Sequence, residues 1–358
     1  MKTCARPYSR LCEAPSRIGC ASLLGCALGV LAIFPNAAFA QGAHANTLDA
    51  HEDALDAFDA AIYAMPHAND EGPGDSMYAT APAQEARVPT QFQFRGLLPL
   101  GYNTNVEERG NGGSDSGDFW PRGDLSVTAP AGQLPIRLTG SIGAEGENYF
   151  AVPSENIQYL RAQLRAQYVD SNNDQAFSPY FAIAPRNTFI NGFGTQISAR
   201  QDFNLGIQKR WNLGSDFQLV PIAGSTSSAT ALSFGLTVIG QRRERSPQVG
   251  SEAIYIIPSV SYEITDDLSV SAEVEALSRW FDGNAAGFER HDYEVVPVAT
   301  LEYVLPVSFF GGNSDLRRHL GRPAFDLQQG YTHVWSNRAD GGFSQSLTRG
   351  VLSLRWRF

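Results

Sequence analysis

From Gln91 to the end of the chain, apolar and polar residues alternate one by one. In the stretch LRAQLRAQY, one set of alternate positions holds Leu160, Ala162, Leu164, Ala166 and Tyr168, and the other holds Arg161, Gln163, Arg165 and Gln167. The stretch 268–276 repeats the pattern, with Ser269, Ser271, Glu273 and Glu275 at its polar positions. Because successive side chains of a strand point to opposite faces, this pattern predicts strands with one apolar and one polar face.

Twelve segments follow this rule: 91–102, 118–128, 134–146, 157–169, 176–187, 199–211, 229–241, 252–264, 267–281, 291–305, 325–336 and 345–358. They are long for soluble strands, but they have the length that a tilted strand needs to cross a bilayer. Inside lipid every backbone N–H and C=O must be paired, which strands achieve only in a closed sheet. We therefore predict an all-β fold, a transmembrane antiparallel up-and-down β-barrel of about twelve strands. The competing interpretation is a soluble β-sandwich or propeller.

The connections between these segments differ in length. Odd-numbered connections are mostly long and polar: 103–117, 188–198, 242–251 and 282–290. Most even-numbered ones are tight: 129–133, 170–175 and 265–267. Long outer loops and short periplasmic turns are typical of outer-membrane barrels, and an even strand number returns both termini to the periplasm. Residues 212–228 and 306–324 are long for turns, so fourteen strands are the alternative count.

The first 40 residues predict export. A basic start precedes the apolar run ASLLGCALGVLAIF, and the small residues Ala38 and Ala40 suit cleavage before Gln41. We therefore expect residues 1–40 to be a signal peptide; a membrane anchor is the alternative, for which the apolar run is short.

Residues 41–88 form a different kind of segment, which precedes a barrel domain at 89–358. Leu48, His51, Leu55, Phe58 and Ile62 give one apolar helical stripe among acidic residues. Pro66 ends the predicted helix, and a linker rich in Pro, Gly and small residues follows. An acidic periplasmic helix of this kind is either a loosely docked terminal helix or a plug or handle for a periplasmic partner.

Composition narrows the possible chemistry. All four cysteines lie in residues 1–40, so the mature chain has no disulfide, thiolate nucleophile or cysteine-ligated metal. Without the leader, 23 basic and 36 acidic residues remain, a net charge of −13, and such a chain is a poor nucleic-acid binder. The mature histidines show no ligand spacing, so we expect no metal and no cofactor.

The chain ends in VLSLRWRF, with large apolar residues at alternate positions Leu352, Leu354, Trp356 and Phe358. This ending resembles the terminal strand of bacterial outer-membrane barrels, in which it is the signal that the barrel-assembly machinery reads. GYNTNV at 101–106 and the last hairpin are similar to porin-like barrels of proteobacteria. The resemblance implies a location in the cell outer membrane and, as partners, outer-membrane lipid and lipopolysaccharide. The basic run 242–245, expected in an outer loop, is either a contact for lipopolysaccharide phosphates or a solvated charge run.

The polar strand faces carry charge that should line the lumen. The predicted lumen-lining residues are Arg95, Glu145, Arg161, Arg165, Arg210, Glu273, Glu275, Glu294, Glu302, Arg355 and Arg357. Arg355 and Arg357 should lie opposite Arg95 where the last strand closes on the first. Such charges either line a water-filled pore and select solutes by charge, or pair across the lumen and close it.

A catalytic alternative rests on His333 and Ser336. Outer-membrane lipid hydrolases place a His and a Ser two positions apart, on one strand face, whereas here the spacing is three. On a regular strand His333 would instead share the outward face with Tyr331 and Trp335, as an interfacial aromatic-belt residue. We therefore expect no enzymatic activity. The favoured function is a narrow porin-like channel for small polar or charged solutes; the alternatives are a structural or polysaccharide-associated barrel without conductance, and a lipid hydrolase.

Overall fold

The computed structural model describes residues 90–106, 113–132, 134–169, 176–214, 219–220, 230–265, 267–283, 290–338 and 342–357. The predicted signal peptide and the predicted helix and linker at 41–88 lie outside these ranges. The strands are β1 (Gln91–Asn103), β2 (Ser116–Phe119), β3 (Arg122–Pro130), β4 (Ile136–Tyr149), β5 (Ile157–Tyr168), β6 (Ser178–Ile190), β7 (Thr195–Gly214), β8 (Leu219–Val220), β9 (Thr230–Ser246), β10 (Ser251–Thr265), β11 (Leu268–Phe281), β12 (His291–Val304), β13 (Ala324–Ser336) and β14 (Phe343–Arg357). Short helices are η2 (Pro153–Glu155), η3 (Val307–Phe310) and α3 (Ser314–His319).

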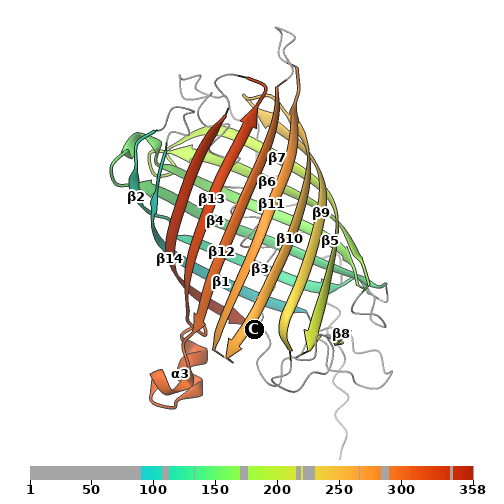
Figure 1. Ribbon diagram of the computed structural model, residues 1–358, viewed down its shortest axis with the longest axis vertical. Helices are drawn as coiled ribbons and strands as arrows, with labels where there is room; N and C mark the ends of the chain where they lie inside the picture. Colours follow the sequence, from blue (N-terminus) through green and yellow to red (C-terminus); the bar gives the residue numbers. More distant parts are fainter. Residues whose placement is uncertain are drawn as a thin grey trace, which may run out of the picture.

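These strands build a closed antiparallel barrel of twelve strands, as predicted (Figure 1). β2 and β3 act as one wall strand, because both pair with β1 and with β4. The break between them falls at Trp120 and Pro121, where proline lacks the N–H that a ladder needs. β8 is a two-residue strand that pairs with β7 outside the wall order, so the alternative of fourteen wall strands is wrong.

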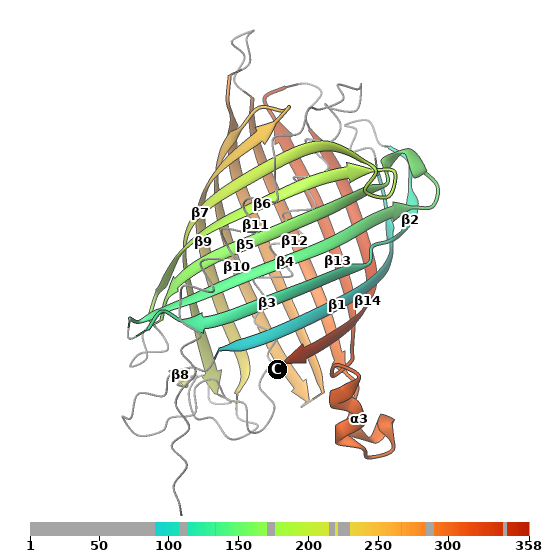
Figure 2. The same ribbon diagram turned by 180° about the vertical axis from the view of Figure 1, so that it is seen from behind.

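The barrel closes by pairing β14 with β1. The register runs from Gln93 opposite Arg357 to Asn103 opposite Leu347, and it brings Arg95 opposite Arg355 as expected. This pairing, the seam, is visible from behind in Figure 2, where the red β14 lies beside the blue β1. We call the rim where β1 begins and β14 ends the terminal rim. Closure leaves neither of the two outermost strands with a free edge.

Two predicted outer loops are much shorter than expected. The connections 188–198 and 242–251 shrink to residues 191–194 and 247–250, because β6, β7, β9 and β10 extend toward one another. The basic run 242–245 therefore lies in β9 and not in a loop: all four residues pair with β7, and Arg242 and Arg243 also pair with β10. Connections at the terminal rim include the long 305–323, so loop length does not distinguish the two rims.

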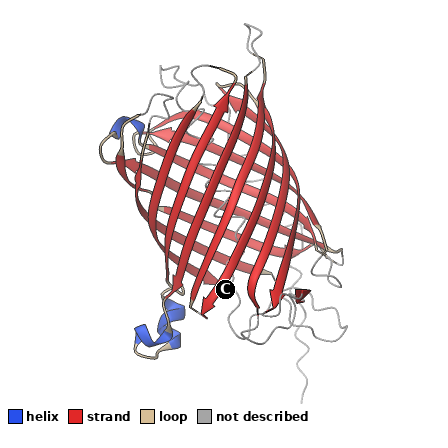
Figure 3. Ribbon diagram, in the orientation of Figure 1, coloured by secondary structure: helices blue, strands red, loops and turns tan. Residues whose placement is uncertain are grey.

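The 305–323 connection holds both η3 and α3, the blue helices below the barrel in Figure 3. The Asn313 side chain accepts a hydrogen bond from the Leu316 N–H at 2.9 Å and caps the start of α3. The Trp356 indole Nε1 donates to the His319 carbonyl at 2.9 Å, which ties this connection to the last strand. No helix in the described part of the chain is long and apolar enough to cross a membrane.

The distribution of apolar and charged side chains between the two faces of the wall is the reverse of that in a soluble protein. Large apolar side chains such as Leu100, Leu205 and Trp335 are exposed on the outside, whereas Glu145, Arg279 and Arg349 are buried inside. Strict alternation along β12 shows this inversion residue by residue. An apolar outer surface around a charged interior is the arrangement that a barrel in lipid requires, and it places the protein in the outer membrane.

Candidate functional site

The lumen is the candidate functional site. The alternation of the strands places nine predicted lumen-lining residues on the inner face: Arg95, Glu145, Arg161, Arg165, Glu273, Glu275, Glu294, Glu302 and Arg355. The side chains of Arg210 and Arg357 lie outside the described residues. The part that these residues play in conduction stays a prediction.

A group of three arginines and two carboxylates occupies the inner face of β3–β6. Arg161 Nη2 lies 2.6 Å from Asp124 Oδ1, and Arg122 Nε lies 3.0 Å from Asp124 Oδ2. Glu145 lies 3.5 Å from Arg161, 3.7 Å from Arg122 and 3.8 Å from Arg186. Among the described residues this group, which we call the arginine cluster, has three cations for two anions.

Backbone and aromatic features hold the arginine cluster in place. A Cβ at Gly143 would overlap Asp124 Oδ1 and lie 3.0 Å from Arg161 Nε, so glycine makes room for this ion pair. The Arg186 guanidinium lies over the Tyr159 ring, 3.7 Å from its centroid. A cation over an aromatic face is stabilised by the ring quadrupole, and it leaves the guanidinium edge for polar partners.

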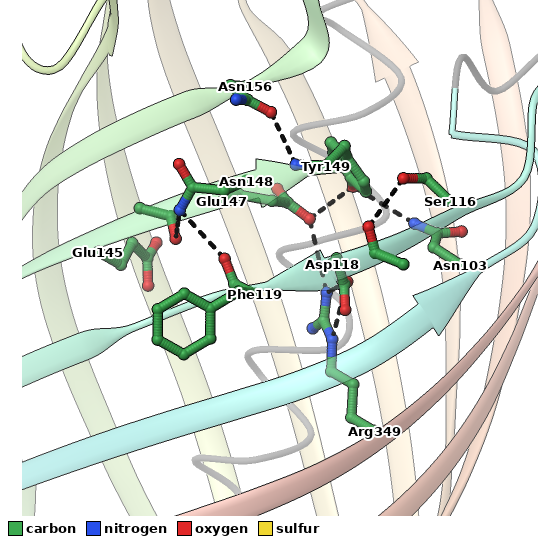
Figure 4. Close-up of polar contacts among 12 residues, drawn as sticks. Asn103, Ser116, Asp118, Phe119, Glu145, Glu147, Asn148, Tyr149, Asn156 and Arg349 are labelled. Carbon is green, nitrogen blue, oxygen red and sulfur yellow. Dashed lines mark hydrogen bonds and ion pairs between the residues drawn. The ribbon is translucent and has the colours of Figure 1, made fainter. Parts of the chain in front are cut away.

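A second network crosses the seam, and Figure 4 shows it. Arg349 of β14 binds Asp118 of β2 at 2.7 Å and Glu147 of β4 at 3.5 Å. The Tyr149 hydroxyl donates to Glu147 at 2.5 Å, and Asn103 of β1 donates to Tyr149 at 3.3 Å. Arg349, Asp118 and Glu147 have side chains that are at most 1% exposed, so this seam network is a buried polar core.

The sequence prediction missed Arg349, Asp118 and Glu147. The three residues come from three strands, and Arg349 lies 231 positions from Asp118, so only the register of the closed barrel brings them together. The sequence did contain an indication for one of them: Arg349 lies on the same face of the last strand as Arg355, which was predicted to line the lumen.

Positive and negative charge lie on different parts of the inner wall. Besides the arginine cluster, Arg200 and Arg243 share Asp202 at 2.9 and 3.0 Å on β7 and β9. Across the barrel, β11–β13 present carboxylates on the same inner face: Glu273, Glu275, Glu294, Glu302 and Asp326. Arg355 of β14 pairs with Glu302 at 3.3 Å. The lumen is therefore basic along β3–β9 and acidic along β11–β13.

His333 lies on the outer face with Tyr331 and Trp335, as its alternation predicts, and Ser336 lies on the inner face. The His333 partner is Ser344 of β14, with 2.6 Å between Nδ1 and the hydroxyl oxygen. The same arrangement recurs at His291, whose Nε2 lies 2.9 Å from the Ser278 hydroxyl and whose ring stacks on Trp280. At both positions a serine on the next strand lies within hydrogen-bond distance of a histidine on the outer face.

No group of three or more His, Asp or Glu side chains within the described ranges is arranged to hold a metal ion.

No family model matches the sequence, and no curated protein matches it. Three solved structures resemble the fold. An outer membrane channel from Pseudomonas putida F1 is 11% identical, the match covers 80% of this chain and 100% of that chain, and the TM-score is 0.45. The translocator domain of autotransporter NalP from Neisseria meningitidis is 10% identical, with 88% of this chain and 99% of that chain covered and a TM-score of 0.40, and the NanC porin is 12% identical, with 72% of this chain and 98% of that chain covered and a TM-score of 0.37.

Proposed function

We propose that this protein is a narrow channel for small polar or charged solutes across the outer membrane. The observation that carries the proposal is the charged inner wall, basic along β3–β9 and acidic along β11–β13. Opposed charges across a lumen attract the two ends of a dipolar solute. They exclude apolar solutes, because an apolar solute displaces water from the charged side chains and offers no polar group in its place.

We also propose that the terminal rim faces the periplasm. An exported chain reaches the membrane from that side, and both ends of the barrel lie at one rim. The acidic residues 41–88 would otherwise have to cross the bilayer, at a high cost for their charges. In this orientation Leu352, Leu354 and Trp356 lie on the lipid face near the periplasmic interface, where the assembly machinery would read them. Phe358 lies outside the described residues.

The solute class is tested by swelling of liposomes that contain the purified mature protein. We expect entry of small zwitterions and small sugars, and exclusion of solutes above the size of a disaccharide. A structural barrel without conductance predicts no swelling with any solute, and this result would overturn the proposal. Empty liposomes and liposomes with heat-unfolded protein are the controls.

A further inference from the structure

The 305–323 connection exposes large apolar side chains outside the barrel wall. Phe309 of η3 is 69% exposed, and Leu316 of α3 and Leu320 at its end are each 44% exposed. Neither η3 nor α3 contains a buried residue, so these helices do not pack into a core of their own. Apolar side chains grouped on an exposed element mark a contact with a partner or with a membrane.

The same connection is basic, although the mature chain has a net charge of −13, from 23 basic and 36 acidic residues. Its charged residues are three arginines and one aspartate: Arg317, Arg318, Arg322 and Asp315. The exposed Arg318 side chain forms no ion pair or hydrogen bond with any other described residue. Arg317 Nε likewise has no hydrogen-bond partner in the described part of the chain. These two guanidinium groups are therefore available to an anion from outside the protein.

The connection ends on the lipid-facing side of the wall. The Trp356 indole donates to the His319 carbonyl, and it packs so closely on Gly321 that a Cβ there would lie 2.6 Å from the ring. Trp356 in turn lies beside the exposed Phe94 of β1, with 5.4 Å between the ring centroids. Aromatic side chains at the end of a membrane-spanning strand lie at the depth of the lipid headgroups. The end of the connection is therefore at that depth as well.

The direction of the connection continues this surface. Figures 1 and 2 view the barrel from opposite sides, and both show α3 beyond the end of the wall and toward one side of the barrel. Phe325, which follows the connection in β13, is exposed on the outer face. The apolar side chains of the connection thus extend the lipid-facing surface of β13 and β14 into the headgroup region.

We propose that the 305–323 connection binds the headgroups of anionic phospholipids in the leaflet at the terminal rim. In this arrangement Phe309, Leu316 and Leu320 contact the upper part of the acyl chains, and Arg317 and Arg318 contact the lipid phosphates. Apolar area and positive charge both strengthen the binding of an amphipathic element to an anionic membrane surface. With the terminal rim toward the periplasm, as proposed above, this leaflet consists of phospholipids, and lipopolysaccharide lies at the opposite rim.

A fluorescent probe tests this contact in the whole barrel, because the mature chain contains no cysteine. The folded mature chain carries Ser308→Cys, an exposed position next to Phe309, labelled with a nitrobenzoxadiazole group whose fluorescence rises as it leaves water. The labelled barrel is placed in nanodiscs of phosphatidylcholine with an increasing fraction of phosphatidylglycerol. Unchanged heat-modifiable mobility on gels shows that each variant is folded.

Two charge variants are compared in this assay. Arg318→Gln removes one of the two available arginines, and Arg338→Gln, after the end of β13 at the opposite rim, changes the net charge equally. We expect phosphatidylglycerol to raise the fluorescence. Arg318→Gln should raise the phosphatidylglycerol-to-phosphatidylcholine ratio at half effect about fivefold, the usual effect of one basic residue near an anionic surface. Arg338→Gln should change this ratio less than about twofold, since the bilayer thickness exceeds the distance over which salt screens a charge.

Three results would each overturn the proposal. The first is fluorescence that does not respond to phosphatidylglycerol, and the second is an equal effect of Arg318→Gln and Arg338→Gln. The third is a larger response to lipid A than to phosphatidylglycerol at the same molar fraction, which would assign the connection to the lipopolysaccharide leaflet. The fluorescence does not depend on conduction, so this test stands apart from the proposed channel function.

Discussion

At the residue scale, Arg349 is the side chain on which the seam depends most. It joins β14 to β2 and β4 through Asp118 and Glu147, and its guanidinium lies 4.1 Å from the centroid of the Trp120 ring. Without Arg349, the buried carboxylates of Asp118 and Glu147 would lose the cation that they share. The loss of one member of a buried ion pair costs far more than the pair contributes in total.

Arg349→Gln should therefore lower the free energy of unfolding by about 3–5 kcal/mol, the usual cost of a buried charge that loses its partner. The measurement is urea unfolding of the barrel in detergent or lipid, followed by tryptophan fluorescence. The neighbouring Thr348→Val, on the outer face, is the control and should cost less than about 1 kcal/mol. Equal effects of the two substitutions would show that the seam network is not stabilising.

Gly143 supports a second prediction at this scale. Gly143→Ala should displace the Asp124–Arg161 ion pair, because the added Cβ would overlap Asp124 Oδ1. The expected loss is about 1–3 kcal/mol of folding free energy, as for other overpacked sites. Gly140→Ala on the same strand meets only Val127 at 3.8 Å, so it is the matched control and should be nearly neutral. The same unfolding assay distinguishes the two.

At the element scale, the strands were largely predictable from the sequence, and their ends were not. The period of two identified all twelve wall strands and the faces of residues such as Glu273 and His333, because one lipid face and one polar face are imposed along every crossing. The interruption at Pro121, the extension of β9 through Arg242 and the helices of 305–323 were missed. These features depend on pairing with a neighbouring strand or on local capping, which alternation does not report.

The tie between the 305–323 connection and β14 gives a prediction about an element. Gly321 has φ +77°, and a Cβ there would lie 2.6 Å from the Trp356 indole. Gly321→Ala should therefore loosen the end of β14 and lower the temperature at which the folded gel band disappears. Gly311 also has a positive φ, but a Cβ added there would meet nothing within 4 Å. Gly311→Ala therefore reports only the cost of placing alanine in a left-handed backbone conformation, and it should shift the temperature less than Gly321→Ala does.

The last strand also carries the predicted assembly signal. Deleting Phe358 should reduce the amount of folded barrel in the outer membrane much more than it lowers the unfolding free energy of barrel refolded in detergent. The comparison separates recognition during assembly from stability after it. Equal losses in both measurements would contradict the signal interpretation.

At the scale of the whole molecule, the wall divides two environments. The outside is apolar and carries an aromatic and histidine belt with Trp280, His291 and Trp335. The inside holds opposed basic and acidic walls. We propose that these opposed charges guide polar solutes through the lumen.

Single-channel recording in planar lipid bilayers tests the central claim most directly. The purified mature protein should give discrete conductance steps in potassium chloride. Arg161→Glu, which inverts a charge on the basic wall, should shift the reversal potential in a salt gradient toward cation selectivity. Folded protein that inserts into the bilayer and gives no conductance steps would contradict the channel function.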